Sequence, residues 1–290
     1  MKSMIGYDGF DWRPDLEVQS GNNYGDGIIT GASAIVVNTS RKEWSIFDLW
    51  TPIKSYRDEH LWVPVAERLG RGHLIRLIDS CIRLGIYPDP KQIGTNLSPI
   101  EHPDKFWKYF LEWAVELHRQ ALLLNAKDLI KGKYSRVYMR MLVTGLQSGV
   151  GPPSVDNPRP GSVQLILQPL GEYAAPNAIV LPSDTLTVGD PMARVKMTAN
   201  YPTYIQMKHA AHERAATLWG LEVDDSFSVK LGSGGQLLVG EASTSTLGGV
   251  WMLGGEPTVL VPDHAVNNTL VGRTAGWILK IAEEELGLKA

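Results

Sequence analysis

The sequence predicts a mixed α/β or α+β protein built from two domains. Runs with apolar residues at helical spacing and short apolar runs typical of strands occur in both halves of the chain. The 290 residues, 43% of them apolar, are enough to bury a core and suit one large domain or two of ordinary size. Between the halves, GPPSVDNPRPG at 151–161 carries four prolines and can continue neither a helix nor a central strand. We therefore expect a first domain at 1–150, a linker at 151–161 and a second domain at 162–290.

The first domain is expected to combine three strands with two helices. Apolar runs predict strands at 31–38, 44–49 and 136–144, and helical spacing predicts helices at 72–84 and 103–125. The apolar faces of these helices are expected to consist of Leu74, Leu77, Ile78, Cys81, Ile82 and Leu84, and of Phe106, Phe110, Trp113, Ala114 and Leu117.

The second domain is expected to hold several short strands and two helices. Short apolar runs predict strands at 162–168, 178–181, 227–230, 236–239, 250–253 and 258–261, and helical spacing predicts helices at 202–219 and 273–286. The residues expected to face inward on the last helix are Trp277, Ile278, Ile281, Ala282 and Leu286.

The composition argues against several classes of protein. The net charge is -3, and no basic or acidic stretch recommends a nucleic acid or a basic partner. The single cysteine, the absence of an apolar signal region in MKSMIGYDGFDWRPDLE and the lack of any run of ~18 apolar residues predict a cytoplasmic protein without a membrane partner. Seven histidines lie scattered without HExxH or CxxC spacing, so no metal site is expected, and neither a GxSxG elbow nor a P-loop occurs.

Several segments carry chemistry-bearing residues in a specific order. In the second half, VKMTANY at 195–201 places Lys196 four residues before Asn200 and Tyr201, and GSGGQLLVGEASTST at 232–246 supplies Glu241. TVLVP at 258–262 then leads to Leu270, Gly272, Arg273 and Thr274. In the first half, YGDGIITG at 24–31, GHLIRLIDSC at 72–81 and VYMRMLVTGLQSGVG at 137–151 supply Tyr24, Arg76, Tyr138 and Arg140.

Taken together, these segments resemble the class-IV aminotransferases. These are fold type IV enzymes of pyridoxal 5'-phosphate (PLP), and they include branched-chain and D-amino-acid aminotransferases and aminodeoxychorismate lyase. The resemblance implies a small N-terminal α/β domain, a larger C-terminal pseudo-barrel domain that binds PLP, and a homodimer. The family pattern continues beyond the last helix of this chain, and its later turn, which resembles G-T-x-x-x-i-x-P, has no counterpart in the 290 residues.

The resemblance gives Lys196 and Glu241 the central roles. Lys196 would hold the cofactor, because a lysine amine can join its aldehyde and afterwards move a proton as acid and base. Glu241 would face the pyridine nitrogen and keep it protonated. The structural alternatives are a surface lysine that opens a helix and a glutamate in an exposed turn.

The resemblance also implies the remaining cofactor contacts. Tyr201 would donate to the phenolic oxygen of the cofactor, unless it is a core tyrosine. Arg76 would bind the phosphate with its planar fork, unless it is a helix arginine reaching for water. Arg273 and Thr274 would hold the same phosphate at the start of the last helix, unless Thr274 is an ordinary N-cap.

The substrate side is implied less completely. Tyr24, Tyr138 and Arg140 would line it, and Arg140 either binds a substrate carboxylate or orders the tyrosines. Thr30 and the run STST at 243–246 depart from the family pattern near both ligands, so the substrate class does not carry over. The sequence thus predicts transfer of an amino group between an amino acid and a 2-oxo acid. A PLP lyase of the same fold and a non-catalytic homologue that binds PLP or a partner stay open as alternatives.

Overall fold

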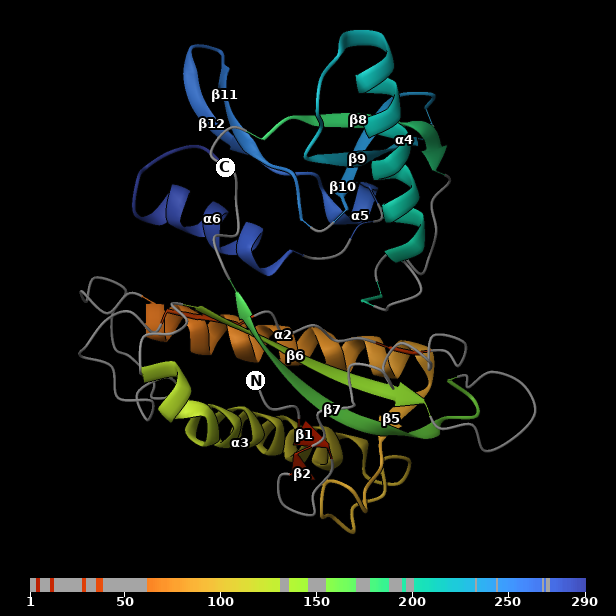
Figure 1. The fold of residues 1–290 in the computed structure, drawn as a ribbon, viewed down its shortest axis with the longest axis vertical. Coiled ribbons are helices and arrows are strands. Elements are labelled where there is room, and N and C mark those ends of the chain that lie inside the picture. The colour runs from red at the N-terminus through yellow and green to blue at the C-terminus, as the bar shows by residue number, and fades with distance from the viewer. Residues whose placement is uncertain are drawn as a thin grey trace. The chain divides into compact units, whose positions relative to one another are not determined.

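The computed structural model contains two compact units, which are described separately (Figure 1). Unit 1 comprises Met1–Tyr173 and Lys196–Ala199, and unit 2 comprises Ala174–Val195 and Asn200–Ala290. The structure describes residues 4–5, 11–12, 28–29, 35–38, 62–130, 136–145, 155–170, 178–187, 195–196, 201–232, 234–243, 245–267, 269 and 272–290. Helices and strands occur in both units, which confirms the predicted mixed α/β class.

Unit 1 is built on a largely antiparallel sheet. Its elements are β1 (Met4–Ile5), β2 (Asp11–Trp12), β3 (Ile28–Ile29), β4 (Ile35–Asn38), α2 (Trp62–Leu84), β5 (Ile86–Pro88), α3 (Pro103–Ile130), β6 (Arg136–Gly145) and β7 (Arg159–Leu170). The strand order is β2-β1-β7-β6-β3, while β4 also pairs with β6, and β5 pairs with β7 in parallel. The β6–β7 ladder runs from Arg136 opposite Leu170 to Gly145 opposite Gly161, and it forms the centre of the sheet.

One apolar cluster joins the two helices of unit 1 to its central strands. It contains residues of α2, β5, α3, β6 and β7, and Phe106 and Phe110 of α3 are among its fully buried members. On β6, Met139, Met141 and Val143 lie on one face and are at 0% exposure, and Leu142 and Thr144 on the opposite face are buried as well, at 6% and 8%. The predicted apolar faces of both helices are confirmed at their centres, although Ile82 of α2 is 46% exposed.

Unit 2 combines a βαβ arrangement with a hairpin. Its elements are β8 (Val180–Thr187), α4 (Tyr201–Trp219), β9 (Asp225–Leu231), β10 (Leu237–Ala242), β11 (Gly249–Leu253), β12 (Glu256–Leu260), α5 (His264–Asn267) and α6 (Arg273–Glu284). β8 and β9 are parallel, α4 connects and contacts both, and β10 pairs antiparallel with β9. β11 and β12 form an antiparallel pair whose turn needs Gly254 and Gly255, because both have positive φ.

The division of the chain differs from the expected one. The proline-rich segment at 151–161 precedes or enters β7, and β7 belongs to unit 1 because it pairs with β6 along its length. The first unit therefore extends to Tyr173, and Lys196–Ala199 joins it again from further along the chain. Proline near the start of β7 is compatible with pairing, because Pro160 lies next to the short parallel strand β5 at the margin of the ladder.

Two further expectations differ from the structure or lie outside it. The inward face expected for the last helix is wrong in part, since Ile278, Ile281 and Leu286 are 49%, 41% and 64% exposed, whereas Ala275 and Ala282 are the buried positions among the described side chains of this segment. The side chain of Trp277 lies outside the described residues. Periodicity identifies an apolar face, but it does not say whether another element covers that face. The strand expected at 44–49 lies outside the described residues.

None of the helices in the described part of the chain has both the length and the apolar character that are needed to cross a bilayer.

Candidate functional site

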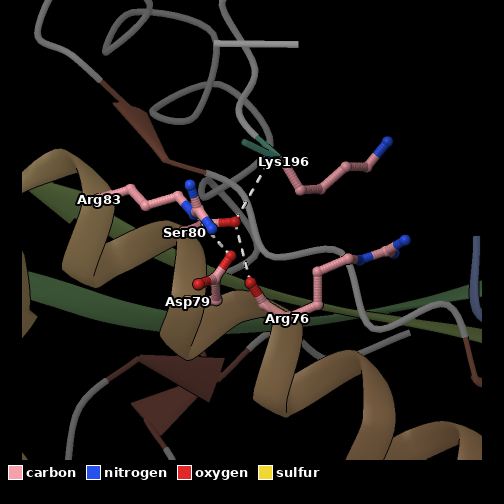
Figure 2. Close-up of polar contacts among 5 residues, drawn as sticks. All are labelled: Arg76, Asp79, Ser80, Arg83 and Lys196. Atoms are coloured by element: carbon pink, nitrogen blue, oxygen red, sulfur yellow. Dashed lines mark hydrogen bonds and ion pairs between the residues drawn. The ribbon is translucent and has the colours of Figure 1, made fainter. Parts of the chain in front are cut away.

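Lys196 lies in unit 1, where its backbone is held against helix α2. The N–H of Lys196 donates to Oγ of Ser80 over 3.1 Å, and the Ser80 hydroxyl donates in turn to the carbonyl of Arg76 over 2.9 Å (Figure 2). Ser80 is fully buried, whereas Lys196 is partly exposed and lies in neither a helix nor a strand. The expectation of a surface lysine that opens a helix is therefore not met, because α4 begins only at Tyr201.

Arg76 lies one helical turn before Ser80 on α2. Its Nη2 is 3.0 Å from Nδ1 of His73, and because a guanidinium can only donate, the Nδ1 of His73 accepts and its proton is on Nε2. In Figure 2 the side chains of Arg76 and Lys196 extend to the same side of the view, and the exposed Asp79–Arg83 ion pair lies on the other. Unit 1 thus presents an amine and a guanidinium that are linked through the backbone and one hydroxyl.

Glu241 lies in unit 2, inside strand β10 and not in an exposed turn. It is 7% exposed, and its N–H donates over 3.1 Å to Oγ of Ser228 on the neighbouring strand β9. A side chain at Gly240 would collide with the Ser228 hydroxyl, so glycine allows β10 to approach β9 at this point. A carboxylate buried to this extent needs compensating partners, which is typical of a functional or structural position and not of a surface turn.

The strand beside Glu241 has an unusual buried face. Ser226, Ser228 and Lys230 alternate along β9 and are all buried, as the two-residue period of a strand requires. The ammonium of Lys230 donates over 2.6 Å to the carbonyl of Asn267, and the Asn267 amide donates over 2.9 Å to the carbonyl of Val239. Buried polar groups thus lie along β9, the strand that pairs with β10 and contacts the backbone of Glu241 through Ser228.

The other residues predicted for the site are described only in part. Tyr138 and Arg140 both belong to strand β6, two positions apart, and Arg140 is partly buried. Tyr201 is the first residue of α4, and Arg273 and Thr274 are the first two of α6. Tyr24 and the side chains of Tyr138, Tyr201, Arg273 and Thr274 lie outside the described part of the chain.

The start of α6 differs from the ordinary N-cap considered for Thr274. The N-cap is Gly272, which provides no side-chain hydrogen bond to the helix. The first backbone N–H groups of an α-helix have no acceptor within the helix, and such groups can bind an anion. The start of α6 therefore has the chemistry expected of a phosphate contact.

Sequence reasoning missed Ser80, because its place on α2 is local information but its contact with Lys196 is not. Ser80 is four residues after Arg76, a spacing that places both on one side of a helix. It also missed the polar face of β9, which the alternation of Ser226, Ser228 and Lys230 in DSFSVKL would have indicated.

Comparison with known proteins gives similarity to solved structures only. No family model matches the chain, and no curated protein matches it. A branched-chain amino acid aminotransferase from T.th., solved with pyridoxamine 5'-phosphate, is 18% identical at a TM-score of 0.49, over 76% of this chain and 59% of that one. The Thermobaculum terrenum enzyme (M3 mutant) is 18% identical at 0.48, and the Escherichia coli enzyme 16% identical at 0.47, each over 76% of this chain and 58% of its own. The chain thus spans less than three fifths of the length of the proteins it resembles.

Proposed function

We propose that the chain is a PLP-dependent enzyme of the fold type IV kind, and that it is an aminotransferase. The observation that supports this most is the link from Lys196 through Ser80 to the turn of α2 that carries Arg76. It joins an amine, which can bind an aldehyde, to a guanidinium, which can bind a phosphate dianion, within one compact unit. PLP carries an aldehyde and a phosphate on one ring.

The chemistry of the available donors fits this cofactor. When bound, PLP supplies an aldehyde and a ring that takes up electrons from the substrate. In the proposal, Lys196 binds the aldehyde carbon and moves the proton at the substrate Cα, while Arg76 binds the phosphate. Glu241 holds the proton on the ring nitrogen, and its burial in β10 supports that role over an exposed turn.

The remaining roles come from the sequence resemblance. Tyr201 donates to the phenolic oxygen of the cofactor, and Arg273 and Thr274 contribute phosphate contacts at the start of α6. Tyr24, Tyr138 and Arg140 line the substrate side, where an amino acid and a 2-oxo acid exchange the amino group. The cytoplasmic location, the homodimer and the assignment of PLP binding to 162–290 likewise stay predictions.

The proposal is tested by locating the cofactor on the chain. The purified 290-residue protein is incubated with PLP, reduced with borohydride, digested and mapped by mass spectrometry. We expect the pyridoxyl group on Lys196, its loss in Lys196→Ala, and its retention in Lys91→Ala, which removes an exposed lysine of the same unit. A label on another lysine, or none at saturating PLP, would contradict the proposal.

The same protein distinguishes an aminotransferase from the alternatives. A panel of amino acids is added to the PLP-loaded protein, and the pyridoxamine form is measured by absorbance and by mass. An aminotransferase must produce this form, whereas a lyase releases product without it. Glu241→Gln is expected to keep the label on Lys196 and to lower the rate at which the pyridoxamine form appears by orders of magnitude, because the ring nitrogen loses its carboxylate partner.

A further inference from the structure

The hydroxyl of Ser80 connects the two residues on which the proposed function depends. It accepts the N–H of Lys196 over 3.1 Å and donates to the carbonyl of Arg76 over 2.9 Å (Figure 2). Its side chain is 0% exposed, so water does not readily replace it as the acceptor. The contact bridges 116 positions of the chain, and Lys196 itself lies in neither a helix nor a strand.

Removal of this hydroxyl would act on Lys196 more than on α2. Within a helix, the carbonyl of Arg76 already accepts the backbone N–H of Ser80, four residues on. The Ser80 hydroxyl is therefore a second donor to the Arg76 carbonyl. For the backbone N–H of Lys196, the same hydroxyl is the acceptor. In Ser80→Ala the helix would keep the backbone hydrogen bond from Ser80 N–H to the Arg76 carbonyl. The Lys196 N–H would lose its hydrogen bond to the Ser80 hydroxyl.

We propose that Ser80 is a positioning residue that sets the separation between the Lys196 amine and the Arg76 guanidinium. The aldehyde and the phosphate lie at fixed places on one rigid molecule, so the groups that bind them must keep a matching separation. Because the hydroxyl bonds to the backbone of both residues, it couples the segment of Lys196 to the turn of Arg76. This inference rests on the proposed function of Lys196.

The test compares Ser80→Ala and Ser80→Thr with two control variants. Ser80→Thr keeps a hydroxyl that can bond to the carbonyl four residues back. Ile86→Val removes one methyl group from the core of the same unit, and Asp79→Ala removes the exposed ion pair with Arg83 on the neighbouring position of α2. The first control reports an effect of lost stability alone, and the second an effect of any change on this part of the helix.

Two quantities are measured for each variant. One is hydrogen exchange of the Lys196 amide without cofactor, and the other is the PLP concentration that gives half-maximal borohydride-trapped label on Lys196. In Ser80→Ala we expect exchange at Lys196 and the half-saturating concentration each to rise about tenfold, the effect of one lost buried hydrogen bond. Ser80→Thr is expected to restore both, and the two controls to match the wild type.

The outcomes separate this inference from the proposed function. A labelled wild type with unchanged half-saturation in Ser80→Ala would overturn the role of Ser80 and leave that of Lys196 intact. Equal losses in Ser80→Ala and Ile86→Val would also overturn it, since they would follow stability. A wild type without label on Lys196 would overturn both. If Ser80→Ala fails to fold, Ser80→Cys, of similar volume and with a weaker donor and acceptor, takes its place with the same expected loss.

Discussion

The two units bury different kinds of side chain. The largest fully buried side chains of the described residues all belong to unit 1: Phe106, Phe110, Leu74, Leu77, Ile93, Met139, Met141, Leu165 and His118. Unit 2 buries mainly small side chains, among them Ala211, Ala215, Ala275 and Ala282, and exposes larger ones such as Trp219, Trp251 and Met252. Apolar burial therefore stabilises unit 1 more than unit 2, and the neighbourhood of Lys196 lies on the better-packed unit.

The largest expected effect comes from the core of unit 1. The ring of Phe106 is fully buried and makes edge contacts with Tyr87 and Trp107 at centroid separations of 6.3 and 5.3 Å. Phe106→Ala removes these contacts and leaves a cavity, so we expect a loss of about 3–5 kcal/mol in the free energy of unfolding. Hydrogen exchange would measure it, with β6 and β7 losing protection while β9 and β10 keep theirs. Equal losses of exchange protection in both units would show that the two units unfold together, and would contradict the difference in stability between them.

A somewhat smaller effect is expected from pH, again in unit 1. Burial lowers the pKa of His118 from 6.5 to about 4, and its bond to the carbonyl of Ala114 opposes this shift only in part. The folded unit therefore favours the neutral ring, and the unfolded chain takes up the proton first as the pH falls. Above pH 6.5, His118 gives the free energy of unfolding no pH dependence. The free energy of unfolding then decreases as the pH falls from 6.5 to about 4, and His118 causes no further change below that pH.

The size of this pH effect is about 3 kcal/mol, from the pKa difference between the folded and unfolded chains. Chemical denaturation at a series of pH values would measure it. His118→Gln is expected to flatten the curve between these pH values. A slope that persists in His118→Gln would contradict the assignment.

The smallest of these effects is expected in unit 2. The side-chain amide of Asn267 donates to the backbone carbonyl of Val239, and the backbone carbonyl of Asn267 accepts a hydrogen bond from the ammonium of Lys230. Asn267→Ala removes the first bond and keeps the second, because the second involves the backbone, so we expect a loss of about 1–2 kcal/mol. Faster exchange confined to β10 would support this. A loss as large as that of Phe106→Ala would mean that polar contacts stabilise unit 2 as strongly as apolar burial stabilises unit 1.

The sequence predicted most elements of the fold because their periodicity is local. The helices expected at 103–125 and 202–219 correspond to α3 and α4, and the strand at 136–144 to β6. Helix α2 begins at Trp62 and not at residue 72, and Pro64 is compatible with this start because it lies in the first turn, where proline is tolerated. The division of the chain could not be predicted in this way, since it depends on the pairing of β7 with β6, and local composition does not encode pairing.

The site residues proposed from the sequence stay predictions, and the sequence did not give the surroundings in which the structure places them. The expectation for Glu241 left a cofactor contact and an exposed turn open, and the β9–β10 pairing places the residue inside a strand. Ser80 was not predicted at all, because a hydroxyl in a helix shows no partner 116 positions away until the chain is folded. Contacts between distant segments are thus what the residue pattern lacked.

The core of unit 1 also contains the single cysteine of the chain, and its reactivity can be used to measure local opening of this core. Cys81 is fully buried on α2, directly after Ser80, and burial raises the pKa of its thiol. A thiol in this state reacts with an alkylating reagent only when the surrounding structure opens. The rate at which Cys81 becomes modified therefore measures how often helix α2 separates from its sheet, one position from the hydroxyl that holds Lys196, with no added label and no competing thiol.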